Sequence, residues 1–233
     1  MINSKKILAI IPLRGGSKGV PQKNIREVDG KPLFMWSAEQ AHKSCYIDRL
    51  IISTDDDEIM AVAQKYGCEV PFKRPEALAT DEAKTIDVIL HALANVSQDY
   101  DYVVLLQATS PLRTAHDIDR CISLCEEGEA NSVVTVTELE KPLHWIYRKD
   151  QKNKITPLLS DGQSPSRRQD SDPLYQLNGA VYVNDVQTLI KNKQFINETT
   201  LAHVMPAESS LDIDNELDFL VFEQLVTQNK HNR

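Results

Sequence analysis

Residues 7–24 constrain the chain most, because a short apolar run leads there straight into a glycine-rich basic loop. Residues 7–11, ILAII, have the length and β-branched content of a buried strand. The loop after Pro12 carries three glycines, which let a backbone turn tightly and approach a ligand closely. Its basic and polar side chains are Arg14, Ser17, Lys18, Lys23 and Asn24. This combination predicts a polyphosphate site, with a plain surface loop of solvated basic residues as the alternative.

The spacing of the glycines excludes two common phosphate-binding loops. Gly15, Gly16 and Gly19 form GGxxG, whereas a dinucleotide fingerprint needs Gly-x-Gly-x-x-Gly. A Walker loop needs a glycine, four further residues and then a Gly-Lys-Ser/Thr triplet, and no glycine of this stretch is so placed before a Gly-Lys pair. The sequence therefore disfavours a dehydrogenase and a Walker-type nucleotide hydrolase.

Apolar runs and amphipathic stretches alternate along most of the chain. Strands are predicted at residues 7–11, 50–52, 69–72, 102–106, 132–137, 178–183 and 201–205. Helices are predicted at residues 32–44, 59–66, 85–96, 115–127, 185–192 and 215–228. The run at 102–106 is the most apolar and is expected at the centre of the sheet. The alternation predicts an α/β sandwich with a largely parallel sheet.

The character of the sequence changes between about residues 140 and 176. Charged, proline-bearing and polar stretches dominate there, including KDQKNK at 149–154 and SDGQSPSRRQDSDP at 160–173. Such a long irregular segment inside a compact domain is usually functional or an interaction arm. We therefore expect a single domain over residues 1–233, with an arm inserted at about 140–176.

Charge and composition limit the partners and the compartment. The net charge of −8, from 26 basic and 34 acidic residues, provides no global basic field for nucleic acid. No stretch approaches the ~18 apolar residues that cross a bilayer, which predicts no membrane partner. Residues 1–6 leave no room for a signal peptide before the first strand. Cys45, Cys68, Cys121 and Cys125 form no Cys-x-x-Cys pair, as expected of reduced thiols in a cytoplasmic protein.

Polar residues follow two more of the predicted strands, where open α/β sheets bind their ligands. Ser53, Thr54 and Asp55 follow the strand at 50–52, and Asp55 either faces a ligand or caps the next helix. The segment QATSPLR follows the strand at 102–106. Its Arg113 either faces the ligand or pairs structurally with a carboxylate.

Several segments resemble, in order, the motifs of the acylneuraminate cytidylyltransferases, the CMP-sialic acid synthetases. Residues 14–24, RGGSKGVPQKN, resemble the family's RGGSKG-x-x-x-KN, with Leu13 where the family usually has alanine. Residues 74–81, RPEALATD, resemble RP-x-x-LA-x-D. Residues 105–113, LLQATSPLR, resemble LLQPTSPLR, with Ala108 in place of proline.

The resemblance continues to the end of the chain. Residues 168–182 carry RQ and then NGAVY, similar to the family's RQ…NGAIY, and residues 210–216, SLDIDNE, resemble its metal motif. The resemblance implies a three-layer α/β/α Rossmann-like nucleotidyltransferase fold with a mainly parallel central sheet and a protruding dimerisation arm. It also implies a homodimer whose arm crosses to a second subunit and whose active site is shared.

The resemblance assigns the residues of a CTP site. The triphosphate would be held by the glycine-rich loop, namely Arg14, Gly15, Gly16, Ser17, Lys18 and Lys23. Asn24, Arg74 and Asp81 would complete the nucleotide site. Arg74 would otherwise be interpreted as a surface residue of an Arg-Pro loop. The catalytic residues implied are Arg14, Lys23, Asp212 and Asp214.

The resemblance also assigns a sugar site, formed by Gln107, His144, Arg168, Tyr182 and Phe195. Arg168 suits the carboxylate of the acceptor sugar, and the neighbouring Arg167 is the alternative. Tyr182 alone would be an ordinary buried strand tyrosine. The chain has His144 where the family typically has lysine, and Ile196 where it has a second aromatic residue. These departures leave the acceptor open and favour a bacterial relative of sialic acid, such as legionaminic acid.

Asp212 and Asp214 are the predicted ligands of Mg²⁺. Carboxylates at i and i+2 on an extended segment point to the same side, as a single hard cation requires. The alternative is that Asp214 caps the helix that follows. The sequence offers no obvious general base, and we favour Asp212 acting through a water on the ion.

These residues predict a cytidylyltransferase that joins CMP from CTP to the anomeric hydroxyl of a nine-carbon 2-keto sugar acid and releases pyrophosphate. Such a product would be an activated sugar for surface glycan synthesis. Two alternatives remain open. One is a cytidylyltransferase for a different 2-keto sugar acid, and the other is a nucleotide-binding protein without catalysis.

Overall fold

A computed structural model of the chain describes residues 2–16, 19–128, 130–141, 143–158 and 173–231. Its centre is a six-stranded sheet in the order β10-β6-β9-β5-β1-β4. The first strand, β1 (Ile7–Pro12), lies between β4 (Arg49–Ser53) and β5 (Tyr102–Leu106) and is parallel to both. The predicted central place of the 102–106 strand is confirmed, because β5 has three strands on one side and two on the other.

The strand β9 (Tyr175–Asp185) runs against its two neighbours. It pairs antiparallel with β5 and with β6 (Ser132–Glu138), and β6 is parallel to β10 (Leu201–Val204). The register of β6 and β9 shifts between Val134 and Val136. Three of the five pairings are parallel, so the predicted mainly parallel sheet is confirmed.

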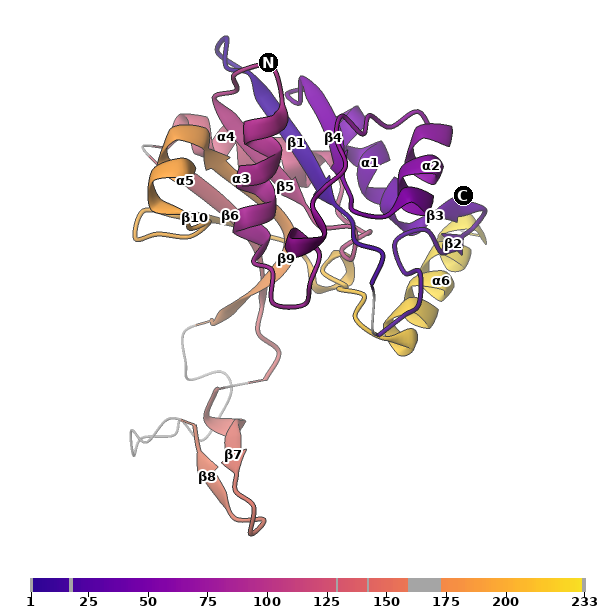
Figure 1. The fold of residues 1–233 in the computed structure, drawn as a ribbon. Helices are drawn as coiled ribbons and strands as arrows, with labels where there is room; N and C mark the ends of the chain where they lie inside the picture. Colours follow the sequence, from indigo (N-terminus) through magenta and orange to yellow (C-terminus); the bar gives the residue numbers. More distant parts are fainter. Residues whose placement is uncertain (1, 17–18, 129, 142, 159–172, 232–233) are drawn as a thin grey trace.

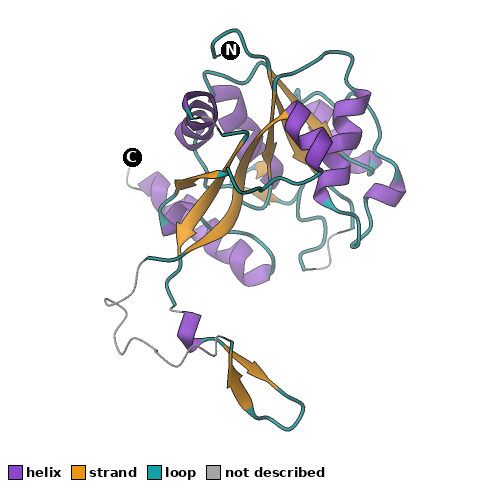
Figure 2. Ribbon diagram, turned by 90° about the vertical axis from the view of Figure 1, so that its left-hand side faces the viewer, coloured by secondary structure: helices purple, strands orange, loops and turns teal. Residues whose placement is uncertain are grey.

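Helices cover both faces of the sheet (Figure 1, Figure 2). On one face lie α1 (Leu33–Lys43), α2 (Asp57–Lys65) and α4 (Ala115–Glu127), and on the other lie α3 (Thr85–Asn95) and α5 (Val186–Asn192). Side chains of β1 alternate between the two interfaces, with Ile7, Ala9 and Ile11 in the first core cluster and Leu8 and Ile10 in the second. The predicted three-layer α/β/α fold is confirmed.

A third core cluster lies beneath the glycine-rich loop. The helix α6 (Glu216–His231) contributes Phe219 and Phe222, both fully buried. They pack with Val20 from the loop and Ile213 from the acidic segment, and a short hairpin of β2 (Glu27–Val28) and β3 (Lys31–Pro32) closes the cluster with Val28. The C-terminal helix thus supports the loop and the acidic segment from one side.

One predicted strand is wrong, and one hairpin was not predicted. Residues 69–72 form no strand, since this stretch makes only isolated bridges, Ile51 with Glu69 and Thr54 with Lys73. Pro71 supplies no N–H to a ladder, which explains why pairing does not continue. The hairpin of β2 and β3 was not predicted, because two-residue strands leave no periodic pattern.

The predicted arm leaves the sheet after β6 and returns at β9, and it protrudes below the sheet in Figure 1. It contains a 3₁₀ turn, η2 (Leu143–Trp145), and an antiparallel hairpin of β7 (Tyr147–Lys149) and β8 (Ile155–Pro157). The arm exposes large apolar side chains, such as Trp145 at 64% and Ile155 at 62%. Among the described residues, no helix has the length and apolar character needed to cross a bilayer. The single-domain division of the chain stays a prediction.

Candidate active site

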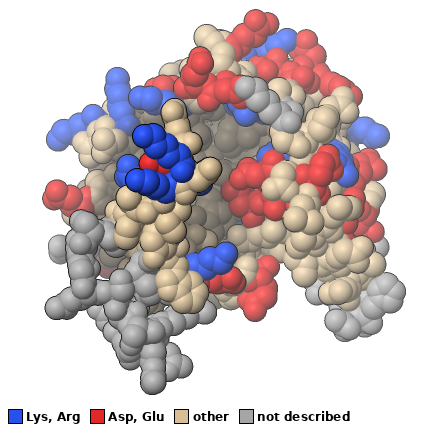
Figure 3. Space-filling view, turned by 90° about the horizontal axis from the view of Figure 1, so that it is seen from below, with Lys and Arg blue, Asp and Glu red and all other residues tan. Residues whose placement is uncertain are grey.

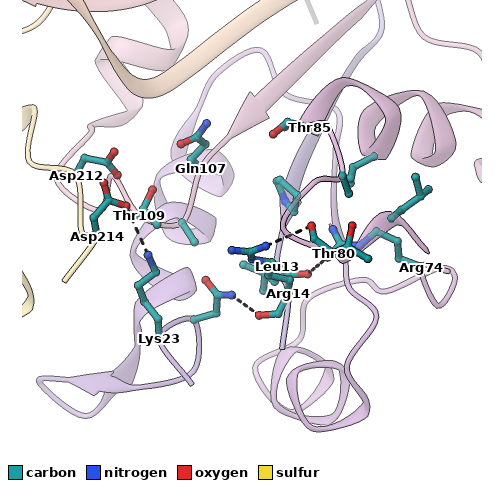
Figure 4. Close-up of a pocket in the computed structure, with 16 residues that line it drawn as sticks. Leu13, Arg14, Lys23, Arg74, Thr80, Thr85, Gln107, Thr109, Asp212 and Asp214 are labelled. Carbon is teal, nitrogen blue, oxygen red and sulfur yellow. Dashed lines mark hydrogen bonds and ion pairs between the residues drawn. The ribbon is translucent and has the colours of Figure 1, made fainter. Parts of the chain in front are cut away.

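A pocket of about 300 Å³ lies at the carboxyl ends of β1 and β5. The underside of the molecule, where these strands end, is hollowed, with basic and acidic side chains on different sides of the hollow (Figure 3). Figure 4 shows the pocket residues converging from five segments. They are Pro12, Leu13, Arg14, Lys23, Asn24, Arg74, Leu78, Thr80, Ala83, Thr85, Val88, Gln107, Ala108, Thr109, Asp212 and Asp214.

Lys23 connects the glycine-rich loop to the acidic segment (Figure 4). Its Nζ donates a 2.7 Å hydrogen bond to the backbone carbonyl of Ile213 and lies 3.9 Å from Oδ1 of Asp214. The side chain is only 12% exposed. Burial lowers the pKa of Lys23, while the charges of Asp214 and Asp212 oppose that shift.

Arg14 projects into the pocket and is oriented by polar neighbours. Its Nη1 lies 2.9 Å from Oδ1 of Asp81 and donates to the carbonyl of Thr80 at 3.4 Å. Asn24 is 7% exposed, and its Nδ2 donates to the Arg14 carbonyl at 3.0 Å. Asp81 therefore reaches the site through Arg14, and the Asn24 amide nitrogen stabilises the loop backbone beside the pocket.

The glycines of the loop differ in what surrounds them. A Cβ on Gly19 would collide with the backbone carbonyl of Asp214, and one on Gly15 with the carboxylate of Asp56. Gly16 has open space around the corresponding position. The loop is therefore packed between the acidic segment and the N-terminus of α2. The predicted phosphate ligands Ser17 and Lys18 lie outside the described residues.

Arg74 lines the pocket and is only 3% exposed. Its Nη2 donates to the carbonyl of Leu13 at 2.6 Å and to Asp55 at 3.0 Å, and its Nη1 donates to the carbonyl of Ser53 at 3.3 Å. Burial lowers the pKa of Arg74, with the bond to Asp55 opposing. Nε is buried without a hydrogen-bond partner in the described structure, so one donor stays unused.

The pairing with Arg74 corrects one interpretation of Asp55. Asp55 does not cap α2, because the N-cap is Asp56, which accepts from the backbone N–H groups of Glu58 and Ile59 at 2.9 Å each. The two neighbouring carboxylates have different partners at the end of β4. Asp55 orients Arg74, and Asp56 satisfies the first turn of the helix.

Asp212 and Asp214 form the acidic wall of the pocket. Ile213, between them, is fully buried in the α6 cluster, and its N–H donates to the Thr109 carbonyl at 2.8 Å. Burial raises the pKa of Asp212, and the nearby charge of Asp214 adds to the shift, while a hydrogen bond from Thr109 opposes it.

Asp214 is not the cap of α6. Asn215 accepts from the N–H groups of Leu217 at 2.8 Å and of Asp218 at 3.2 Å, which is how an N-cap satisfies a first turn. The capping interpretation of Asp214 is therefore wrong. Its carboxylate remains available beside Asp212.

The acidic pair meets the requirements of Mg²⁺. Among the described residues, no group of three or more His, Cys, Asp or Glu side chains could hold a metal ion. Mg²⁺ needs no such cage, since it is usually bound by one or two carboxylates together with waters and substrate phosphates. Two carboxylates facing a pocket with Arg14 and Lys23 fit that requirement.

The structure describes the side chains of three of the five predicted sugar residues, and they lie in two different places. Gln107 lines it. Tyr182 and Phe195 contact each other, with ring centroids 5.5 Å apart, and are half-buried against the α3–α5 core cluster. His144 belongs to η2 on the arm, below the sheet in Figure 1, and its side chain is not described. Arg168 and its alternative Arg167 lie outside the described residues.

Arg113 bonds to the protein backbone, and its partners differ from the expected one. It is 1% exposed and does not line the pocket. Its Nε donates to the carbonyl of Ala180 at 2.7 Å, and its Nη2 donates to the carbonyl of Gln107. The partners are backbone carbonyls and not a carboxylate.

Sequence reasoning missed much of the pocket wall between β4 and α3. Leu78 in η1 (Glu76–Leu78), Thr80, Ala83 and the first turn of α3 line the pocket. Thr109 was also missed as a site residue, although its position after β5 was a usable signal. Leu78 and Thr80 lie within the RPEALATD motif, which was a usable signal, whereas Ala83 and the first turn of α3 carried none.

Comparisons with known proteins agree with this geometry. A family model described as Cytidylyltransferase matches residues 8–204. The chain is 37% identical over 229 residues to the N-acylneuraminate cytidylyltransferase of Escherichia coli O18:K1:H7, covering 98% of this chain and 53% of that protein. It is 35% identical over 230 residues to the CMP-N,N'-diacetyllegionaminic acid synthase of Legionella pneumophila, covering 97% and 98%. It is 32% identical over 229 residues to the pseudaminic acid cytidylyltransferase of Campylobacter jejuni, covering 97% and 98%.

The chain thus spans about half the length of the Escherichia coli relative and nearly all of the other two. Among solved structures, it resembles CMP:2-keto-3-deoxy-manno-octonic acid synthetase complexed with CTP, with a TM-score of 0.75 and 15% identity over 96% of this chain and 99% of that one. At that identity the likeness shows a shared nucleotidyltransferase fold. The family match over most of the chain and the relatives above 30% identity show that this protein belongs to the cytidylyltransferase family.

Proposed function

We propose that this protein transfers CMP from CTP to the anomeric hydroxyl of a sialic-acid-like nonulosonic acid and releases pyrophosphate. The names of the relatives support the substrate class, since they include an N-acylneuraminate, a legionaminic acid and a pseudaminic acid enzyme. The observation that carries the proposal is the pocket, which is lined by the basic side chains of Arg14 and Lys23 together with the carboxylates of Asp212 and Asp214.

The chemistry needs positioning and charge neutralisation more than covalent participation of the protein. The anomeric oxygen attacks the α-phosphorus, its bond to phosphorus forms, and the bond to the β-phosphate oxygen breaks. Arg14 and Lys23 offset charge that develops on the departing pyrophosphate. The hydroxyl proton must also leave, and Asp212, which lines the pocket, is our candidate acceptor.

Mg²⁺ is part of the proposal. Asp212 and Asp214 would hold it at the acidic wall. When bound, the ion would neutralise triphosphate charge and polarise the reacting phosphoryl group. Lys23 sits beside the same carboxylates, 3.9 Å from Asp214, so it limits their mutual repulsion before the ion arrives.

The nucleoside is proposed to lie toward Arg74 and the stretch between η1 and α3. Arg74 is oriented by Leu13 and Asp55 and still has an unpartnered Nε–H. A guanidinium with a spare donor suits the acceptor atoms of a cytosine base. Gln107 would face the acceptor sugar, with Arg168, His144, Tyr182 and Phe195 completing that side.

A homodimer completes the proposal. The arm exposes Trp145, Tyr147 and Ile155, and exposed apolar side chains on one segment suit burial against a second copy of the chain. Such a contact would bring the arm residues of one subunit to the pocket of the other. A cytoplasmic location is proposed with it, since all four cysteines are free.

The experiment is a pyrophosphate-release assay with CTP, Mg²⁺ and a panel of nonulosonic acids. Pyrophosphate release that requires both CTP and one of these acids supports the proposal. A second candidate is a cytidylyltransferase for an eight-carbon 2-keto sugar acid, favoured only by the fold shared with the octonic acid synthetase. Adding 2-keto-3-deoxy-manno-octonic acid to the panel separates the two. Tight CTP binding without turnover of any acid would point to the non-catalytic alternative.

A further inference from the structure

Arg113 is a buried charge that the proposed chemistry does not use. It is the largest of the fully buried side chains, at 1% exposure. Its hydrogen-bond partners are the neutral carbonyls of Gln107 and Ala180, and its Nη1 is buried without a hydrogen-bond partner in the described structure. Asp117 and Asp212 act on the guanidinium only as nearby charges, so no carboxylate bonds to it directly, and its burial is costly. In return its bonds to two backbone carbonyls hold together the segments that contain Gln107 and Ala180.

Arg113 holds the backbone of Gln107, a predicted sugar residue that lines the pocket. The backbone carbonyl of Gln107 accepts from Nη2 of Arg113 and, at 3.4 Å, from the hydroxyl of Ser37. The side chain of Gln107 is confined as well. A Cβ on Gly179 would lie 2.9 Å from Oε1 of Gln107, and Gly179 has a φ of +73°. The absence of a side chain at Gly179 therefore leaves the space that the Gln107 amide occupies.

The hydrogen bonds of Arg113 and of its neighbours in the loop after β5 join three segments of the site. Arg113 holds the loop after β5 to Ala180 of β9, next to the register shift between β6 and β9. A second bond, from the Ser110 hydroxyl to the Asn178 carbonyl at 3.3 Å, repeats the connection. On its other side the same loop binds the acidic segment through Thr109. A β-bulge beside an active site commonly changes the direction in which a side chain points.

From this geometry we infer that Arg113 is a positioning residue for the acceptor sugar, which it affects by fixing Gln107 against Gly179. The inference rests on the proposed function, because it assumes that Gln107 faces the sugar. Arg113 itself touches neither substrate. Its loss should weaken use of the sugar while leaving the CTP end of the pocket intact.

The first test compares Arg113→Met and Arg113→Lys with wild type by steady-state kinetics and by urea unfolding. We expect Arg113→Met to raise the KM for the nonulosonic acid about tenfold, the loss expected for one charged hydrogen bond, with the KM for CTP changed less than about twofold. Arg113→Lys keeps the charge but cannot span both carbonyls, so its effect should be intermediate. A matched control is Arg49→Met, which removes an arginine bonded to Glu69 and Tyr100, outside the proposed site. Equal increases of both KM values in the Arg113 variants would overturn the inference.

The second test is a double-mutant cycle with Gln107→Ala. If Arg113 acts through Gln107, then Arg113→Met should change the KM for the sugar less than about twofold in the Gln107→Ala background. Multiplicative effects would show that Arg113 acts by another route and would overturn the inference.

Gly179→Ala keeps the test decisive if Arg113→Met does not fold. It crowds the Gln107 amide from the other side and should raise the same KM, again only while Gln107 is present. A Gly179→Ala enzyme with an unchanged sugar KM would count against the inference. Wild-type enzyme that turns over none of the acids would instead overturn the proposed function, so the two failures are distinguishable.

Discussion

The ammonium group of Lys23 donates a 2.7 Å hydrogen bond to the backbone carbonyl of Ile213, joining two segments 190 residues apart in the sequence. The same two segments share the α6 core cluster, through Val20 and Ile213, and Gly19 packs against the carbonyl of Asp214. The cationic loop and the acidic wall are therefore one packed unit, supported by α6. Charges of both signs are in place before CTP binds, which is what electrostatic preorganisation requires.

Asp212→Ala should abolish pyrophosphate release that depends on CTP and Mg²⁺, with a loss of at least about a thousandfold, because a lost metal ligand removes several kcal/mol of charge stabilisation. The protein should stay folded, as measured by circular dichroism and thermal unfolding. Asp57→Ala is the matched control, since Asp57 is 79% exposed and pairs with the surface residue Lys73. Normal turnover by Asp212→Ala would contradict the metal assignment.

Lys23→Met should weaken CTP binding by about tenfold to a hundredfold, because the apolar stem is kept while a charged donor is lost. Calorimetric titration with CTP measures this change directly. Lys73→Met serves as control, since Lys73 is half-exposed and outside the pocket. Equal CTP affinity in the Lys23 variant and wild type would remove Lys23 from the triphosphate site.

Gly19→Ala should lower the thermal midpoint, whereas Gly16→Ala should leave it unchanged. A methyl group on Gly19 collides with the Asp214 backbone, which is not free to move because Ile213 is buried beside it. Gly16 has open space at the same position. Differential scanning calorimetry of the two variants, side by side, measures the difference. Equal midpoints would mean that the loop and the acidic segment are not packed as one unit.

Asp117→Asn should destabilise the protein at neutral pH by about 1–2 kcal/mol, because Asp117 is the acidic partner of the α4 capping box. Burial alone would raise the pKa of Asp117, but hydrogen bonds from Thr114 and His203 outweigh burial and lower it. A lowered pKa contributes stability above the unfolded-state value, and this contribution is lost as the pH falls through the folded-state value. The stability difference between wild type and variant should therefore shrink below about pH 4 in urea titrations. A difference that stays constant with pH would rule out this contribution.

The sheet and its helices were predictable because buried strands and helices carry apolar residues at a regular spacing. The fully buried run at β1 and the apolar stripe of α3 are visible as patterns in the sequence. The spacing of apolar residues did not predict the structure around Pro71 or the two-residue strands β2 and β3. Local backbone chemistry determines whether those segments pair as strands. Motif spacing placed Arg14, Lys23, Gln107 and the acidic pair on one pocket.

Choices between neighbouring residues were less predictable. Whether Asp55 or Asp56 caps α2, and whether Asp214 or Asn215 caps α6, depends on one backbone turn that spacing does not specify. Arg113 has backbone carbonyl partners that leave no trace in side-chain patterns. The proposed acceptor side includes arm residues such as His144, and the irregular sequence of the arm carries no period that would place them.

The most direct test of the central claim is identification of the product by mass spectrometry. The protein would be incubated with CTP, Mg²⁺ and nonulosonic acids that carry heavy oxygen at the anomeric hydroxyl. The account predicts a CMP-sugar that retains the label, together with unlabelled pyrophosphate, since the anomeric oxygen attacks the α-phosphorus. Absence of a CMP-sugar with every acid in the panel, or a CMP-sugar that has lost the label, would contradict it.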